Sequence, residues 1–158
     1  MSSIRKQIID NIASELNKIT IAHGYNQDIK YVEKNKLLPP DQLTLDQFPA
    51  AFIIAAKENK KHADVDAVES DFEVIVEGVI KSNADTDDMQ QLSTNLINDI
   101  EKCLMVDETR GGIAIDTHCF QVVTDYQIFI GYSVFDLHFN INYFHDRYNP
   151  SSQNNSPT

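Results

Sequence analysis

The residues from Tyr132 to Phe144 (YSVFDLHFNINYF) constrain the fold more than any other part of this chain. From position 135 to position 143, the odd positions are all apolar and the even positions between them are all polar. The apolar set is Phe135, Leu137, Phe139, Ile141 and Tyr143, and the polar set is Asp136, His138, Asn140 and Asn142. This period of two predicts a β-strand that is buried on one face and solvated on the other. We therefore expect an α+β fold, a mostly antiparallel twisted sheet with helices packed on one face.

Two segments have the apolar spacing of amphipathic helices. The first is predicted over residues 3–22, where Ser2 or Ser3 can cap the start and Gly24 can end it in a left-handed conformation. Its apolar stripe consists of Ile4, Ile8, Ile9, Ile12, Leu16 and Ile19. The second follows the acidic stretch 83–88, where Asp85 or Thr86 can cap, and its apolar stripe runs from Met89 to Leu104. Both stripes predict packing against the sheet.

Four further segments complete a predicted sheet of four to five strands. They are a short edge strand near 29–32, Ala50–Ala56, Asp71–Lys81 and Ile113–Tyr126. The run Ala50–Ala56 is apolar at every position, which predicts a strand buried on both faces. Between 32 and 50, Pro39-Pro40 excludes helix or central strand, and Leu43, Leu45 and Phe48 can anchor the connector on the core. The charged segment 57–70 is predicted to be a loop.

The length of 158 residues fits a single domain, which we place at residues 3–146. The tail 147–158 is polar, and we expect it to be disordered. The start of the chain lacks the continuous apolar run of a signal peptide, and no stretch approaches the length of a membrane span. These patterns predict an intracellular protein.

The chain is strongly acidic, with 13 Lys and Arg against 24 Asp and Glu and a formal net charge of -11. A surface of this sign repels phosphate, which argues against stable binding of DNA or RNA. Solubility alone is a sufficient explanation of the charge. The alternative explanation of the charge is a surface past which nucleic acid moves without binding.

The residues that carry catalytic or metal chemistry are sparse. Cys103 and Cys119 lie in no CxxC or Cys/His cluster, so we expect buried free thiols and no zinc site. His118 lies two residues from Asp116, and His138 two residues from Asp136, so each pair shares a face of its strand. A general base also needs a neighbouring nucleophile or metal, and the sequence offers no such motif. We expect no cofactor, no metal and no enzymatic activity.

The positively charged residues suggest where another protein can bind. Lys57, Lys60, Lys61 and His62 form the only basic cluster in the sequence, and Arg110 stands in the Asp107–Gly112 turn. Each has two open interpretations. The cluster is either a solvated loop or a loop that contacts a neighbouring subunit. Arg110 either pairs with an acid of its own chain or bridges to a carboxylate on a neighbour.

The order of these elements resembles the tail terminator (tail-completion) proteins of long-tailed bacteriophages. The resemblance covers residues 3–146 and rests on order and spacing. The segments that carry it are Phe48–Ala50, Phe72–Val76, Leu92–Leu104, Asp107–Gly112 and Ile141–Tyr143. The polar extension after Tyr148 is outside the pattern.

The resemblance implies a structural virion protein without enzymatic activity. Members of that family assemble as a hexameric ring on the head-proximal end of the tail tube. The implied partners are other copies of the chain, the tail tube protein and the head-side connector of the neck, with DNA only passing through the lumen and no membrane. Lys57, Lys60, Lys61, His62 and Arg110 are the candidate interface residues on loop position and charge. Another neck component, a minor tail protein, and a small cellular α+β enzyme or ligand-binding module remain open alternatives.

Overall fold

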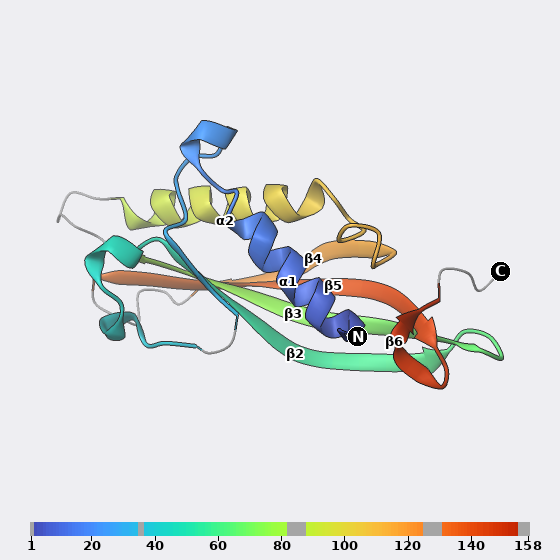
Figure 1. Ribbon diagram of the computed structural model, residues 1–158. Helices are drawn as coiled ribbons and strands as arrows, with labels where there is room; N and C mark the ends of the chain where they lie inside the picture. The colour runs from blue at the N-terminus through green and yellow to red at the C-terminus, as the bar shows by residue number, and fades with distance from the viewer. Residues whose placement is uncertain (1, 35–36, 82–87, 125–130, 155–158) are drawn as a thin grey trace.

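A single sheet with two helices on one of its faces forms the protein (Figure 1). The computed structural model describes residues 2–34, 37–81, 88–124 and 131–154. The helices are α1 (Ile4–Leu16) and α2 (Met89–Met105), and three short 3-10 turns are η1 (Ile21–His23), η2 (Pro40–Gln42) and η3 (Leu45–Gln47). The strands are β1 (Tyr31–Glu33), β2 (Ala50–His62), β3 (Ala67–Lys81), β4 (Asp116–Thr124), β5 (Tyr132–Asp146) and β6 (Asn149–Gln153). The α+β prediction is confirmed, with six strands where four to five were expected.

The predicted strand at 132–144 lies inside the sheet as β5. The strand order is β1-β2-β3-β5-β4, and β6 also pairs with β5. Among the strands of the described residues, only β1 and β2 run parallel, and the other pairs are antiparallel. The odd positions from 135 to 143 are each at most 1% exposed. The strict alternation therefore did predict which face of the strand is buried.

The helices cover the face of the sheet to which these odd residues point. From α1, the core receives Ile4, Ile8, Ile12 and Leu16, and from α2 it receives Leu96, Ile100, Cys103 and Leu104. They pack against the apolar residues of β3 and β5, such as Phe72 and Leu137. The prediction that the apolar stripes of both helices pack against the sheet is therefore confirmed.

The first helix is shorter than predicted. It begins as expected, because the Ser3 side chain accepts a hydrogen bond from the backbone N–H of Lys6. It ends at Leu16, and the Asn17 side chain donates back to the Ala13 carbonyl. Residues 21–23 form the separate turn η1, which Gly24 ends with the predicted left-handed φ of 90°. Asp88 caps α2 by accepting from the Gln91 N–H, whereas the predicted caps Asp85 and Thr86 lie outside the described residues.

A second, smaller core lies on the opposite face, at the end of the sheet where β2 begins. It consists of Leu43, Ala50, Phe52 and Val79, with Leu38, Phe48 and Tyr132 among the partly buried residues around it. The connector folds back over the sheet here. Leu43 and Phe48 anchor it as predicted, but Leu45 is 68% exposed. This second core explains why the start of β2 is apolar on both faces.

The charged segment 57–70 is not a loop, which corrects the sequence prediction. Lys57–His62 continues β2 and Ala67–Ser70 begins β3, so only residues 63–66 turn the chain. Twelve register pairs join the strands, with one irregularity between Ala55 and Lys57. Charged residues are compatible with this hairpin because the outer part of β2 is largely exposed, so burial imposes no apolar pattern there.

The end of the chain also differs from the prediction. Asn149–Gln153 forms β6 beside β5, and the Gln153 side chain donates to the carbonyls of Gly112 and Ile113. Main-chain pairing at a strand edge needs no apolar side chains, which is why a polar composition did not predict it. Residues 155–158 lie outside the described part of the chain.

Candidate functional surface

The sheet face away from the helices carries a ladder of polar pairs between β3 and β5. His138 Nδ1 lies 3.0 Å from Glu73 Oε1, and Asn140 donates to Asp71 at 3.2 Å. Asn142 donates to Glu69 at 2.9 Å and to Asp71 at 3.0 Å. The hydrogen bond from Asn142, with that from Asn140, lowers the pKa of Asp71 below its usual value. We call this set, Glu69, Asp71, Glu73, His138, Asn140 and Asn142, the polar ladder.

The polar ladder has the chemistry of a binding surface. Its carboxylates already accept hydrogen bonds from neighbouring side chains, so they are poor candidates for a general base without rearrangement. In the described ranges, no group of three or more His, Cys, Asp and Glu has the arrangement of a metal site. The predicted His118–Asp116 pair forms, at 3.7 Å. His138 pairs with Glu73 across the strands instead of with Asp136.

Two neighbouring carboxyl groups, Glu77 on β3 and Asp136 on β5, lie where the polar ladder meets the connector. They are direct register partners. Burial, together with the charge of Asp136, raises the pKa of Glu77 to about 7. Burial also raises the pKa of Asp136. Because two carboxylates side by side cannot both ionise cheaply, the pair retains a proton close to neutral pH.

Glu77 also lines a pocket of about 400 Å³ between the connector and the sheet. The other lining residues are apolar: Leu37, Leu38, Pro39, Pro40, Val79 and Val134. Asp136 Oδ1 is buried and accepts no hydrogen bond from any described residue. We call this feature the Glu77 pocket. It combines apolar walls with one carboxyl group, that of Glu77, whose register partner Asp136 is not among the residues that line the pocket.

We expect Glu77→Gln to stabilise the protein above neutral pH. The pKa of Glu77 is higher in the folded chain than in the unfolded chain, so the folded state binds more protons between about pH 4.5 and about 7, and stability falls as pH rises through that window. After allowance for solvent screening, the loss is on the order of 1–2 kcal/mol. Urea unfolding at several pH values should show this slope in the wild type and a flatter one in E77Q. An equal slope in both proteins would contradict the assignment.

The basic cluster predicted as a contact loop lies on the outer half of β2, and much of it is already paired. Lys60 Nζ lies 3.3 Å from Glu58 and 3.1 Å from His145 Nε2. Lys61 pairs with Glu69 across the hairpin at 3.1 Å. Lys57 and His62 are exposed. The four residues therefore remain accessible, on a strand and not on a flexible loop.

Arg110 does not lie on the surface, which corrects the prediction that it is an interface residue. It is 0% exposed. Its Nη2 donates to the carbonyls of Leu104 and Asp107, and its Nη1 donates to Asn11 Oδ1 at 3.2 Å. Leu104 is in the last turn of α2 and Asn11 is on α1. Arg110 therefore caps α2 and ties the two helices together. Gly111 and Gly112, which follow it in the turn, both have positive φ, of 75° and 86°.

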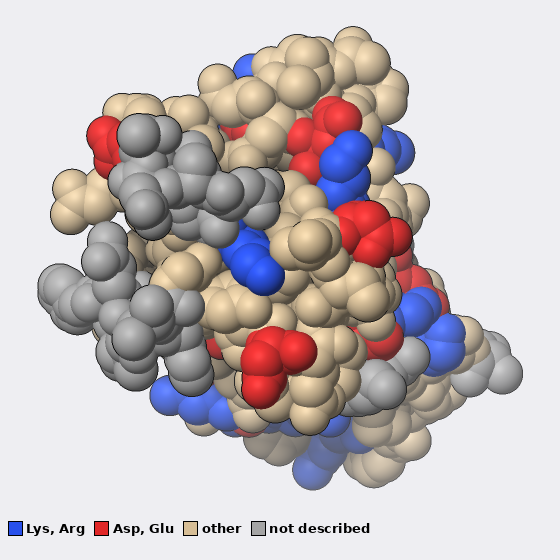
Figure 2. All heavy atoms as spheres, turned by 90° about the vertical axis from the view of Figure 1, so that its left-hand side faces the viewer, with Lys and Arg blue, Asp and Glu red and all other residues tan. Residues whose placement is uncertain are grey.

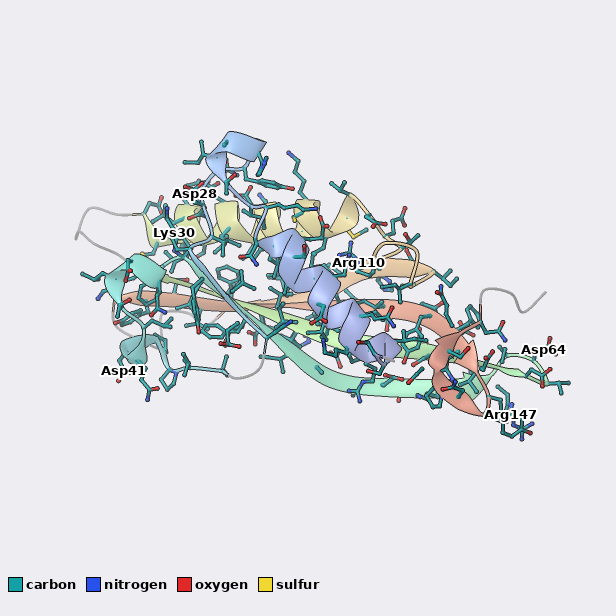
Figure 3. The ribbon with its side chains drawn as sticks, viewed as in Figure 1. Asp28, Lys30, Asp41, Asp64, Arg110 and Arg147 are labelled. Atoms are coloured by element: carbon teal, nitrogen blue, oxygen red, sulfur yellow. The ribbon has the colours of Figure 1, made fainter. Side chains whose placement is uncertain are left out.

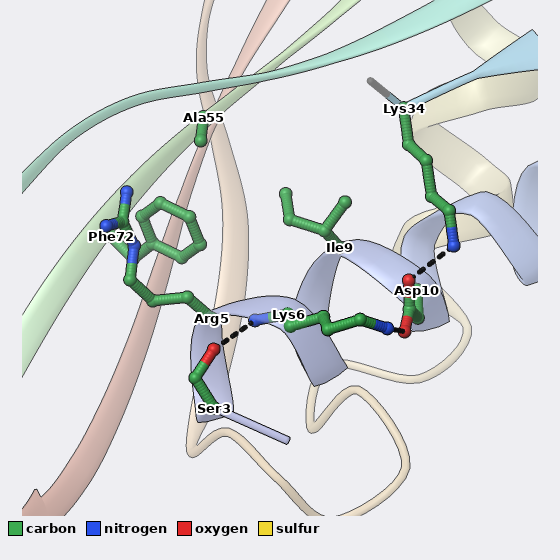
Figure 4. Close-up of a pocket in the computed structure, with 8 residues that line it drawn as sticks. All are labelled: Ser3, Arg5, Lys6, Ile9, Asp10, Lys34, Ala55 and Phe72. Atoms are coloured by element: carbon green, nitrogen blue, oxygen red, sulfur yellow. Dashed lines mark hydrogen bonds and ion pairs between the residues drawn. The ribbon is translucent and has the colours of Figure 1, made fainter. Parts of the chain in front are cut away.

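A second hollow lies between the start of α1 and β2 (Figure 4). Its volume is about 260 Å³, and Ile9, Ala55 and Phe72 form its apolar part. Lys6 and Lys34 both pair with Asp10, at 2.6 and 2.5 Å. Arg5 stacks over Phe72 at 5.0 Å and pairs with Glu58 at 3.3 Å. Because its cations are all paired, a ligand here would have to displace internal contacts.

The acidic pair and its pocket are the features that sequence reasoning missed. Asp136 was assigned to the polar face, but its partner Glu77 lies 59 positions away, and only the register brings them together. The two cysteines are free, as predicted. Cys103 is buried as expected, whereas Cys119 is only partly buried. No helix in the described residues is long and apolar enough to cross a membrane. Comparisons with protein-family models and with curated proteins find no match.

Proposed function

We propose that this protein caps the head-proximal end of a bacteriophage tail tube as a ring, stops tube polymerisation and joins the tail to the neck. The proposal starts from the resemblance in element order. The observation that carries it furthest is the polar ladder, a broad sheet face left uncovered by both helices. Exposed sheet faces and edges of this type are common assembly surfaces.

The charge distribution supports the same proposal. The chain has a net charge of -11, and the polar ladder contains Glu69, Asp71 and Glu73. A ring lumen lined by acidic groups repels the DNA backbone, so DNA can pass without adhering. Lys57 is exposed, and Lys60 and Lys61 can contact acidic surfaces of a tube or neck partner if they exchange their internal pairs with Glu58 and Glu69. In this scheme the chain works by binding and has no enzymatic step.

Electron microscopy of lysates from a phage that lacks this gene tests the proposal. We expect overlong, headless tails beside DNA-filled heads, because nothing ends tube growth. Complementation with the wild-type gene is the control and should restore normal tail length. Tails of normal length with detached or leaking heads would instead support the alternative that the protein is a head-side neck component. Normal virions would contradict every assembly role.

The Glu77 pocket favours one alternative, a ligand-binding module. Its volume of about 400 Å³ lies within the range of small-molecule sites. Native mass spectrometry of the purified protein decides between the two functions. A retained small molecule that is lost from a Val134→Glu variant would favour ligand binding. A bare chain mass, or a multiple of it, would favour assembly.

A further inference from the structure

We propose that the Glu77 pocket receives Arg147 and Tyr148 from a second copy of the chain, so that the two ends of the sheet bind each other head to tail. This inference deepens the proposed function, because it names the contact from which a ring would be built. It rests on two surfaces that are not covered by any described residue of the same chain. The pocket offers one carboxyl group and apolar walls, and the opposite end offers a cation and an aromatic ring.

Arg147 and Tyr148, the two residues proposed to enter the pocket, form the turn between β5 and β6. Tyr148 is 83% exposed, and the Arg147 guanidinium lies 5.4 Å from the centre of its ring. Within the described ranges, Arg147 makes no salt bridge. Its backbone N–H donates to the Asp66 carbonyl at 2.8 Å, which ties this turn to the β2–β3 hairpin. The pair is therefore presented on anchored backbone, and Tyr and Arg are the residues that most often dominate binding energy at interfaces.

The receiving side is complementary to this pair in charge and in shape. The apolar walls of Leu38, Pro39 and Val134 suit the aromatic ring. Asp136 Oδ1 is a buried acceptor without a hydrogen bond from the described residues, and Glu77 stands beside it. A guanidinium in the pocket can donate two hydrogen bonds to the Glu77 carboxyl group because its N–H groups form a planar fork. The contact would thus bring a cation to the carboxyl group that lines the pocket.

The two surfaces cannot meet within one chain. Val134 lines the pocket near the start of β5, and Arg147 directly follows its end, so they are roughly 40 Å apart at about 3.3 Å per residue. Figure 3 shows Arg147 and Asp64 at one end of the molecule and Asp41, which follows Pro40, at the other. Figure 2 views the molecule from the Asp41 end, where acidic and basic side chains lie among uncharged ones. A contact between different surfaces is heterologous, and repetition of it closes into a ring or continues as a filament.

The main test is sedimentation velocity of the full chain over a range of concentrations. We expect concentration-dependent assembly, and Arg147→Glu or Tyr148→Ala should weaken it about thirtyfold or more. Lys18→Glu, a charge reversal in the turn after α1 and part of neither surface, is the matched control and should leave assembly unchanged. R147E keeps an intact pocket, and the pocket variant Val134→Glu keeps an intact Arg147–Tyr148 turn. A mixture of the two should therefore give heterodimers and nothing larger, because the turn of the second can enter the pocket of the first but no further contact can form.

Two further measurements make the result independent of variant stability. In a Cys119→Ser background, Tyr148→Cys with Pro40→Cys should form disulfides only between chains. Assembly should also tighten from about pH 6 to about pH 8, because the incoming cation favours ionised Glu77. The described charged groups on the face of Glu77 are Asp136 on β5, His138 with Glu73 further along the sheet, Glu33 on β1 and Lys81 at the end of β3. The uncharged residues around Glu77 are Leu37–Pro40 of the connector and Phe52, its register partner on β2.

The outcomes separate this inference from the proposed function. Assembly that is unaffected by R147E and Y148A, without the cross-link, overturns the contact but leaves a ring possible through other surfaces. A chain that stays monomeric at all concentrations, or a small molecule that occupies the pocket, also overturns it. Normal tails in the gene-deletion phage would overturn the proposed function, whatever the sedimentation result.

Discussion

Arg110→Ala is expected to destabilise the protein by about 3–5 kcal/mol, the range for emptying a large buried site and leaving polar groups unpaired. The Arg110 side chain is 0% exposed and donates to the carbonyls of Leu104 and Asp107 and to Asn11. Alanine would leave these acceptors without their donor and would open a cavity between the two helices. Arg110→Lys should recover only part of the loss, because an ammonium cannot reproduce the planar fork of donors.

Chemical denaturation followed by far-UV circular dichroism measures this effect, with Arg147→Ala as the matched control. Arg147 is exposed, so its removal should change the free energy of unfolding by less than about 0.5 kcal/mol. If R110A left stability unchanged but abolished assembly, Arg110 would be an interface residue after all, as its place in a turn first indicated.

Gly78→Ala is the second substitution with a large expected effect, a loss of about 2–3 kcal/mol through overpacking. A methyl group at position 78 would lie 2.3 Å from the ring of Phe135, its register partner on β5. That ring is 1% exposed and lies in the main core, so it has little room to move. Glycine is therefore required here for the close approach of an aromatic ring, a role it often has inside strands.

A double-mutant cycle tests the cause of this loss. Phe135→Leu alone should cost about 1 kcal/mol or more, because it removes buried ring atoms. In the Gly78→Ala background the same change should cost less or restore stability, since the smaller side chain makes room for the methyl group. Additive losses would contradict the steric explanation and would point instead to the backbone of β3.

Several features of the fold could be predicted from the sequence because they depend on local periodicity. The alternation in 135–143 identified the buried face of β5, and the helical stripes identified the buried faces of α1 and α2. Ser3 was correctly identified as the cap of the first helix, and the left-handed conformation of Gly24 was also predicted, although Gly24 ends the turn η1 and not α1. These features can be recognised without the tertiary structure because each depends on residues only a few positions apart.

The hairpin and the tail were mispredicted for a common reason. Charged and polar composition predicts solvent exposure, and Lys57–His62 and Asn149–Gln153 are indeed largely exposed. It does not predict the absence of a strand, because the backbone N–H and C=O groups form the ladder whatever the side chains are. Exposure and secondary structure are separate properties, and in these two segments composition gave information only about exposure.

The sequence by itself determined the α+β class, the buried faces of α1, α2 and β5 and the overall acidity, since each is a property of composition or short-range spacing. Only the tertiary structure decided that Arg110 is buried, that Glu77 meets Asp136 and that Gly78 lies under Phe135. Each of these contacts joins residues from different elements. Their energies depend on burial and on strand register, and both are fixed only when the whole sheet has formed.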